Sequence, residues 1–143
     1  MASEIAQKHT ELILDGTKIA YHQERLEKWK RGERFAPITI DMALTRACNY
    51  RCHFCYAMMQ DNDSKKITET VLKDFVDDCS SVGVKGISLV SDGESTLSPH
   101  YDFMVRYGAE RGLSMASGTN GFLLKPDKLE RILPHLTYLR FNF

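Results

Sequence analysis

The sequence predicts an α/β fold built on a parallel sheet, and two observations support this prediction. From residue 37 onward, short apolar segments alternate four times with segments of helical periodicity. Alternation of this kind is typical of parallel strands joined by right-handed helical crossovers. In addition, the 143 residues are 43% hydrophobic and 27% charged, which suits one folded domain of ordinary size.

Four strands are expected, at residues 38–44, 86–90, 113–117 and 138–143. The first is rich in β-branched and apolar side chains, and the second is short and apolar. A parallel strand is normally paired on both edges and covered on both faces. A sequence that stops inside its fourth strand would leave one edge open, so we expect it to be a piece of a longer protein.

Three helices between these strands carry recognisable end signals. Thr68 can cap a first helix that stops before Gly83, and a Ser-Pro pair at 98–99 starts a second helix that ends near Gly112. Pro126 opens the third helix. The side chains expected on the buried faces are Val71, Leu72, Phe75, Val76 and Cys79 in the first helix and Leu129, Ile132 and Leu133 in the third.

Residues 1–36 are expected to form a small extension ahead of the main domain, residues 37–143. An Asp-Gly pair at 15–16 fits a type I′ turn and predicts a β-hairpin over 11–22. A helix is expected over 21–30, because apolar side chains recur there on one side. This extension either packs against the main domain or handles substrate.

The charge balance and the hydropathy pattern exclude several function classes. Lysine plus arginine equals aspartate plus glutamate, 19 against 19, so nothing electrostatic favours nucleic acid or a membrane surface as partner. No apolar run approaches the roughly 20 residues of a membrane-spanning helix, and the charged N-terminus does not resemble a secretory signal. We therefore expect a cytoplasmic protein, in which the four cysteines are ligands, nucleophiles or core residues rather than disulfides.

Three of the cysteines, Cys48, Cys52 and Cys55, follow the first expected strand with the spacing C-x₃-C-x₂-C. Thiolates are soft ligands that suit iron–sulfur clusters or zinc. A cubane cluster usually has one thiolate on each of its four irons. Three local cysteines would therefore leave one iron open to a small molecule, as an open zinc position accepts water.

Zinc is the alternative occupant of this loop. A structural zinc ion takes four ligands, often from two C-x₂-C pairs, and the sequence contains one such pair. His53 is a conceivable fourth ligand that its neighbour Cys52 would crowd. Cys79 falls on the apolar face of a helix, where a core role is expected. The spacing favours a cluster, and a zinc-stabilised interaction module stays open.

The pattern C-x₃-C-x-aromatic-C, placed after the first strand of a β/α unit, resembles the signature of the radical S-adenosylmethionine (SAM) superfamily. The segment DGES at 92–95 follows the second strand, where that family has a Gly-Gly-Glu-Pro-like segment, and Gly93 and Glu94 match it. A Thr-Asn-Gly segment at 119–121 follows the third strand, as it often does in the family. Asn142 lies on the fourth strand, where a polar side chain often touches the SAM ribose.

The resemblance implies a partial TIM-type (β/α) barrel, of which this chain is the first part. It further implies a 4Fe–4S cluster on Cys48, Cys52 and Cys55, with SAM at the open iron. Cleavage of SAM would give a 5′-deoxyadenosyl radical that removes a hydrogen atom from a substrate. The residues that the resemblance places against SAM are Phe54, Gly93, Glu94, Thr119 and Asn142, with Phe54 near the adenine and Glu94 at the amino group.

The substrate is not predicted, because no acid, base or radical-relay residue stands out in the sequence. A peptide and a small molecule both remain open. The family implies a reductant such as flavodoxin or ferredoxin, and it includes members with C-terminal auxiliary cluster domains. The alternative from another class is a non-catalytic iron–sulfur or zinc-binding fragment.

Overall fold

The computed structural model describes residues 21–56, 67–90 and 92–142. The chain divides into two compact units, Met1–Phe35 and Ala36–Phe143. In the first unit, helix α2 spans Gln23–Lys30, as expected from the periodicity of that segment. The hairpin predicted over 11–22 lies outside the described residues apart from its last two positions.

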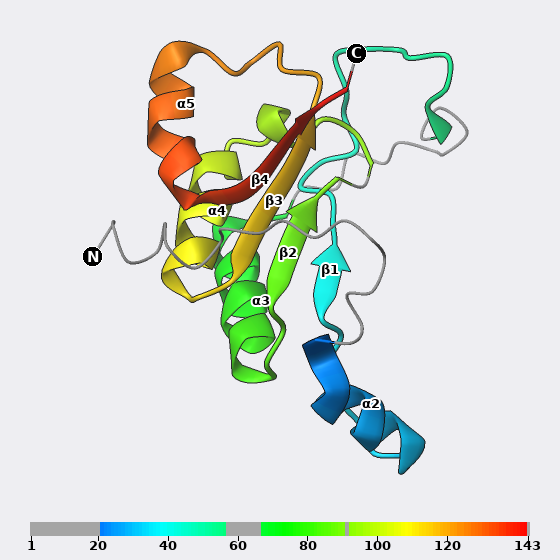
Figure 1. The fold of residues 1–143 in the computed structure, drawn as a ribbon. Coiled ribbons are helices and arrows are strands. Elements are labelled where there is room, and N and C mark those ends of the chain that lie inside the picture. Colours follow the sequence, from blue (N-terminus) through cyan, green and yellow to red (C-terminus); the bar gives the residue numbers. More distant parts are fainter. Residues whose placement is uncertain (1–20, 57–66, 91, 143) are drawn as a thin grey trace. The chain divides into compact units, whose positions relative to one another are not determined.

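A four-stranded parallel sheet forms the second unit, in the order β1-β2-β3-β4 (Figure 1). The strands are β1 (Thr39–Asp41), β2 (Gly86–Leu89), β3 (Ser114–Thr119) and β4 (Leu136–Phe141). The helices between them are α3 (Glu69–Ser81), α4 (Tyr101–Glu110) and α5 (Pro126–Ile132). Short 3-10 turns, η4 (Ser95–Leu97) and η5 (Leu133–His135), precede α4 and follow α5. The α/β class and the parallel sheet are thus confirmed.

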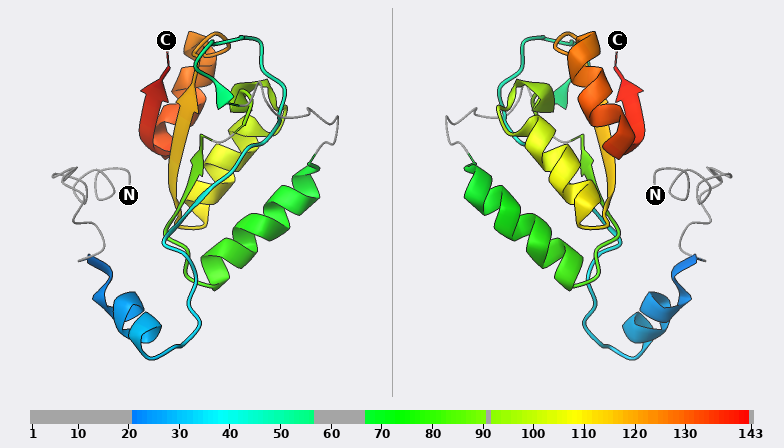
Figure 2. Two further views of the ribbon diagram at one scale, coloured as in Figure 1. Left: turned by 90° about the vertical axis from the view of Figure 1, so that its right-hand side faces the viewer. Right: turned by 90° about the vertical axis from the view of Figure 1, so that its left-hand side faces the viewer.

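Consecutive strands are neighbours in the sheet, so every crossover moves in the same direction. Right-handed crossovers in one direction place all their helices on one face of the sheet. Figure 2 shows α3, α4 and α5 together on that face. This winding is the one found in β/α barrels, where the second face of the sheet becomes the interior.

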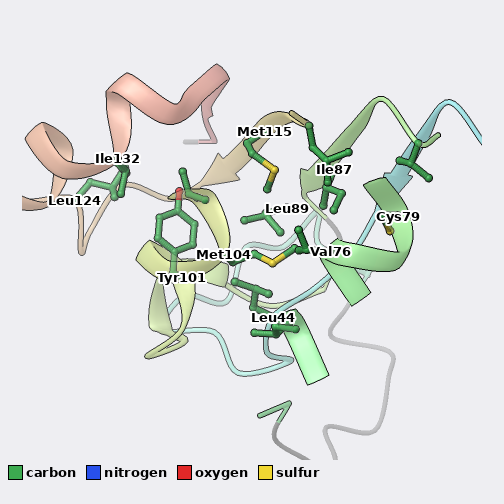
Figure 3. Close-up of a cluster of buried hydrophobic side chains, with 14 residues drawn as sticks. Leu44, Val76, Cys79, Ile87, Leu89, Tyr101, Met104, Met115, Leu124 and Ile132 are labelled. Carbon is green, nitrogen blue, oxygen red and sulfur yellow. The ribbon is translucent and has the colours of Figure 1, made fainter. Parts of the chain in front are cut away.

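The hydrophobic core lies between the sheet and these helices. Alternate residues of β2 and β3, among them Ile87, Leu89 and Met115, point into it and are at most 1% exposed. From the helices, Val76 and Met104 meet them, as Figure 3 shows. The other side chains of the strands face the opposite way, where the register places four in one row: Asp41, Ser88, Ala116 and Tyr138.

Several predicted boundaries differ from the structure for local reasons. The second helix begins at Tyr101, because Ser98 Oγ accepts the His100 N–H and holds a turn before the helix starts. Leu133 is 49% exposed rather than buried, since α5 ends one residue earlier and the chain enters η5. Val71 is 57% exposed, and the buried side chains of α3 are Leu72, Val76 and Cys79.

In the described part of the chain, no helix combines the length and the apolar character needed to cross a membrane.

A polar cluster joins α3 to the end of α4. The carboxylate of Asp77 accepts from Lys73 Nζ at 2.6 Å and from the Tyr107 hydroxyl at 2.8 Å, and Arg111 Nε lies 2.7 Å away. The Lys73 ammonium, and then the Tyr107 hydroxyl, hold the pKa of Asp77 below its ordinary value of 3.8. The cluster therefore stabilises the fold only while Asp77 is ionised.

Replacing Asp77 with Asn should lower the free energy of unfolding at neutral pH, and the loss should shrink in acid. A lowered carboxyl pKa contributes stability that is complete above the unfolded value and disappears as the pH falls through the folded value. The difference in the free energy of unfolding between wild type and Asp77→Asn, measured by urea unfolding, should thus be constant well above the ordinary carboxyl pKa of 3.8 and shrink as the pH falls through the lowered pKa of Asp77. Asp74 is exposed on the same helix, and Asp74→Asn is the control. A difference between wild type and Asp77→Asn that does not shrink in acid would contradict the stabilising role of the ionised Asp77.

Candidate cofactor site

The loops that follow β1, β2 and β3 lie at the same end of the sheet, where the carboxyl ends of the strands meet (Figure 1). The cysteine loop follows β1, residues 92–94 follow β2, and residues 120–122 follow β3. The Glu94 N–H donates to the Ala47 carbonyl at 2.9 Å, which fixes the segment after β2 against the backbone just ahead of Cys48. This edge is where active sites of barrel-type β/α folds form.

The cysteine loop holds three free thiols. Cys48 is exposed, and Cys52 and Cys55 are half-buried. The Tyr50 N–H donates to Cys48 Sγ at 3.4 Å, and the Cys55 N–H donates to the Cys52 carbonyl at 3.0 Å, which closes a turn. Within the described ranges, no three His, Cys, Asp or Glu side chains are grouped closely enough to hold a metal ion. The thiols therefore share one loop without converging on one point.

The donor set fits a soft metal centre in its chemistry, although its sulfur atoms would have to converge on binding. Coupling of metal binding to local ordering is common, because a preformed site is rarely present without the metal. The fourth ligand that zinc would need does not come from Cys79, which is 4% exposed in α3 and whose thiol pKa is raised by burial. His53 lies edge-on to the Phe54 ring, with ring centroids 5.3 Å apart.

Gly93 is required by the backbone at this point. Its φ is +66°, a conformation that other residues rarely adopt, and a Cβ there would meet the Thr45 carbonyl and lie 2.7 Å from that of Ala47. The sequence predicted that this glycine would let a ligand approach. In the structure, the segment that approaches closely is the protein's own cysteine loop.

Glu94 is a buried carboxylate held by four hydrogen bonds. It is 3% exposed. Its Oε1 accepts from the Thr96 N–H at 3.1 Å, the Thr96 hydroxyl at 2.6 Å and the Thr119 hydroxyl at 2.8 Å, while Oε2 accepts from the Asn120 N–H at 2.8 Å. Among the described residues, no lysine, arginine or histidine forms an ion pair with it. The charge is solvated by neutral donors alone, and Oε2 keeps capacity for another donor.

Thr119 and Asn142 also lie at this edge. Thr119 is 1% exposed, and its hydroxyl donates to Glu94 and accepts the Gly121 N–H at 3.0 Å. The Asn142 N–H donates to the Thr119 carbonyl at 2.9 Å, so Asn142 extends the ladder beyond β4. Its amide side chain lies beside Gly118 on the face of the sheet opposite the helices. Phe54 is 62% exposed.

Sequence reasoning missed the polar contacts that connect these segments. The Asn120 side chain donates from Nδ2 to Asn49 Oδ1 at 2.9 Å. The family resemblance includes Asn120 only as part of the Thr-Asn-Gly segment, and no motif includes Asn49 as a contact. Thr96, which supplies two of the donors to Glu94, was also missed. Its place two residues after a carboxylate is a local capping signal, whereas nothing in the sequence marks the asparagine pair.

The structure combines a parallel β/α unit, a three-cysteine loop after the first strand and a buried carboxylate after the second strand. This combination defines a class of cofactor-dependent proteins. The sequence model of the Radical SAM superfamily matches residues 42–143, and the chain belongs to this superfamily.

The curated relatives are enzymes more than twice as long as this chain. The AdoMet-dependent heme synthase of Methanosarcina barkeri is 35% identical over 98 residues, covering 68% of this chain and 28% of that enzyme. The mycofactocin maturase MftC of Mycobacterium tuberculosis is 27% identical over 107 residues, covering 75% of this chain and 27% of the maturase. The chain thus spans less than a third of either relative.

Solved structures show the same fold. SuiB of Streptococcus suis bound to S-adenosylmethionine superposes with a TM-score of 0.66 at 15% identity, covering 94% of this chain and 32% of SuiB. BtrN in complex with AdoMet and 2-DOIA superposes with a TM-score of 0.63 at 19% identity, covering 75% of this chain and 45% of BtrN. At these identities the likeness establishes the fold alone.

Gly93→Ala should displace the cysteine loop, because its Cβ would collide with two carbonyl groups of that loop. Gly112→Ala is a matched control, since Gly112 also has a positive φ, +81°, and a Cβ there would meet nothing within 4 Å. The control should cost about 1–2 kcal/mol for the backbone conformation alone, and Gly93→Ala should cost about 1–3 kcal/mol more in urea unfolding. Equal losses for the two variants would show that the close approach at Gly93 is unimportant.

Proposed function

We propose that the protein holds a 4Fe–4S cluster on Cys48, Cys52 and Cys55 and binds SAM beside it. When bound, the cluster supplies the electron that cleaves SAM to methionine and a 5′-deoxyadenosyl radical, which removes a hydrogen atom from the substrate. Membership of the superfamily and the chemistry of the thiol set support this proposal. The residues of this chain bind, orient and shield the reactants.

The observation that carries the proposal is the buried carboxylate of Glu94 at the edge of the cysteine loop. A buried charge is normally paired, and Glu94 has no cationic partner among the described residues. The ammonium group of SAM is a cation, and a charge-assisted hydrogen bond to Oε2 would satisfy both groups. The four donors around the carboxylate fix its position and therefore where such a cation would lie.

The face of the sheet opposite the helices is the proposed location for the rest of SAM and for the substrate. The side chains of Arg140 and Asn142 lie there beside Gly118. Asn142 is the proposed contact to the ribose, and Phe54 the proposed contact to the adenine. Thr119 is proposed to act on SAM through Glu94, because its hydroxyl is bonded to that carboxylate.

The substrate class stays open between a peptide and a small molecule. SuiB has been solved bound to the precursor peptide SuiA, and another relative is named for nucleotide dehydration. The reductant is proposed to be a small electron carrier such as flavodoxin or ferredoxin. Since the chain spans less than a third of the relatives described above, cleavage of SAM is proposed for this chain, and turnover of a substrate is proposed for the whole protein.

Anaerobic reconstitution with iron and sulfide tests the cluster. The wild-type chain should bind about four irons with the absorption of a cubane cluster. Cys48→Ala, Cys52→Ala and Cys55→Ala should each lose most of that iron, whereas Cys79→Ala, a core substitution, should keep it. Addition of SAM and dithionite should then yield 5′-deoxyadenosine. A cluster without cleavage would support the non-catalytic alternative, and bound zinc without any cluster would refute the proposal.

A further inference from the structure

Two asparagines join the loop after β3 to the cysteine loop. Asn120 Nδ2 donates to Asn49 Oδ1 at 2.9 Å across 71 residues of sequence, and Asn49 directly follows Cys48. The rings of Tyr50 and Phe122, the next residues of each loop to carry large side chains, lie with centroids 6.2 Å apart. The two loops therefore meet through one polar and one aromatic contact.

The side chain of Asn120 is fixed at both ends of its amide. Its Oδ1 accepts the Phe122 N–H at 3.0 Å, and its Nδ2 donates to Asn49. Turning the amide over would place a donor against the Phe122 N–H and an acceptor against Asn49 Oδ1, so the observed orientation is the favoured one. The backbone N–H of the same residue donates to Glu94 Oε2 at 2.8 Å. One residue thus contacts both the carboxylate and the cysteine loop.

We propose that Asn120 is a positioning residue that holds Glu94 and the Cys48 end of the cysteine loop in one hydrogen-bonded unit. The proposal rests on the function proposed above, because it concerns how the chain keeps the carboxylate for the SAM ammonium at a fixed separation from the first cluster ligand. Asn49 is the partner through which Asn120 acts. Neither asparagine is itself assigned a bond to the cluster or to SAM.

This arrangement predicts an effect on SAM affinity rather than on iron content. The three thiols hold the cluster with or without the asparagine pair. SAM has to reach the cluster and Glu94 together, so a loop that drifts from Glu94 weakens its binding. A single hydrogen bond between neutral groups changes a binding constant by about fivefold.

The test is a double-mutant cycle on the reconstituted full chain, with Asn49→Ala, Asn120→Ala and the combined variant. The dissociation constant of SAM is measured from the change in the electron paramagnetic resonance spectrum of the reduced cluster. Each single variant should weaken SAM binding about fivefold or more, and the combined variant no more than Asn120→Ala alone. Asn49→Asp, which keeps the acceptor oxygen, should stay within about twofold of wild type.

Two further measurements separate positioning from a loss of folding. Iron content should match that of wild type, and the urea midpoint should fall only by the small amount expected for the lost hydrogen bonds, with the transition still cooperative. In the metal-free protein, amide hydrogen exchange at residues 49 and 50 should be faster in Asn120→Ala than in wild type, which reports the loop directly and needs no cofactor.

Two outcomes would overturn the role of Asn120 and leave the proposed function intact. In the first, the losses of SAM affinity in the two single variants multiply in the combined variant. In the second, the variants bind SAM as tightly as wild type. A wild-type chain that takes up no cluster or no SAM would overturn the proposed function. In that case, the hydrogen-exchange rates at residues 49 and 50 of the metal-free protein still test whether Asn120 holds the cysteine loop. Equal rates in Asn120→Ala and wild type would show that it does not.

Discussion

The candidate site depends on one buried charge, the carboxylate of Glu94. It lies in the loop that follows β2, and its four hydrogen bonds come from the turn that follows it and from the end of β3. Because an ionised carboxylate is costly to bury without donors, these contacts determine how the two strand ends sit relative to each other. Through Asn120 and Asn49 the same network reaches the loop that carries the thiols.

The winding of the sheet explains why these groups can meet. Parallel strands in sequential order put each βα loop beside the next, so segments after β1, β2 and β3 become neighbours although they are far apart in sequence. With the helices on one face, the core is closed on that side, and polar side chains such as Asp41 and Tyr138 lie on the other. The fold thereby separates the part of the unit that provides stability from the part proposed to bind ligands.

The sequence was sufficient for the elements and insufficient for the contacts between them. Capping residues and periodicity are local, so α3 begins after Thr68 as predicted. The exposure of Leu133 could not be anticipated, because it depends on where α5 gives way to η5. Glu94 was found through a family motif, yet its binding to Thr119 and the Asn49–Asn120 contact depend on tertiary placement that no local pattern encodes.

The most direct test of this account is the affinity of the reconstituted Glu94→Gln variant for SAM. The amide keeps the shape of the side chain but removes the charge proposed to receive the SAM ammonium. Thr96→Val, which removes one donor and leaves the charge, is the comparison. The dissociation constant should rise more than about tenfold in Glu94→Gln and less than about fivefold in Thr96→Val. Unchanged affinity in Glu94→Gln would contradict the assignment of the carboxylate to SAM.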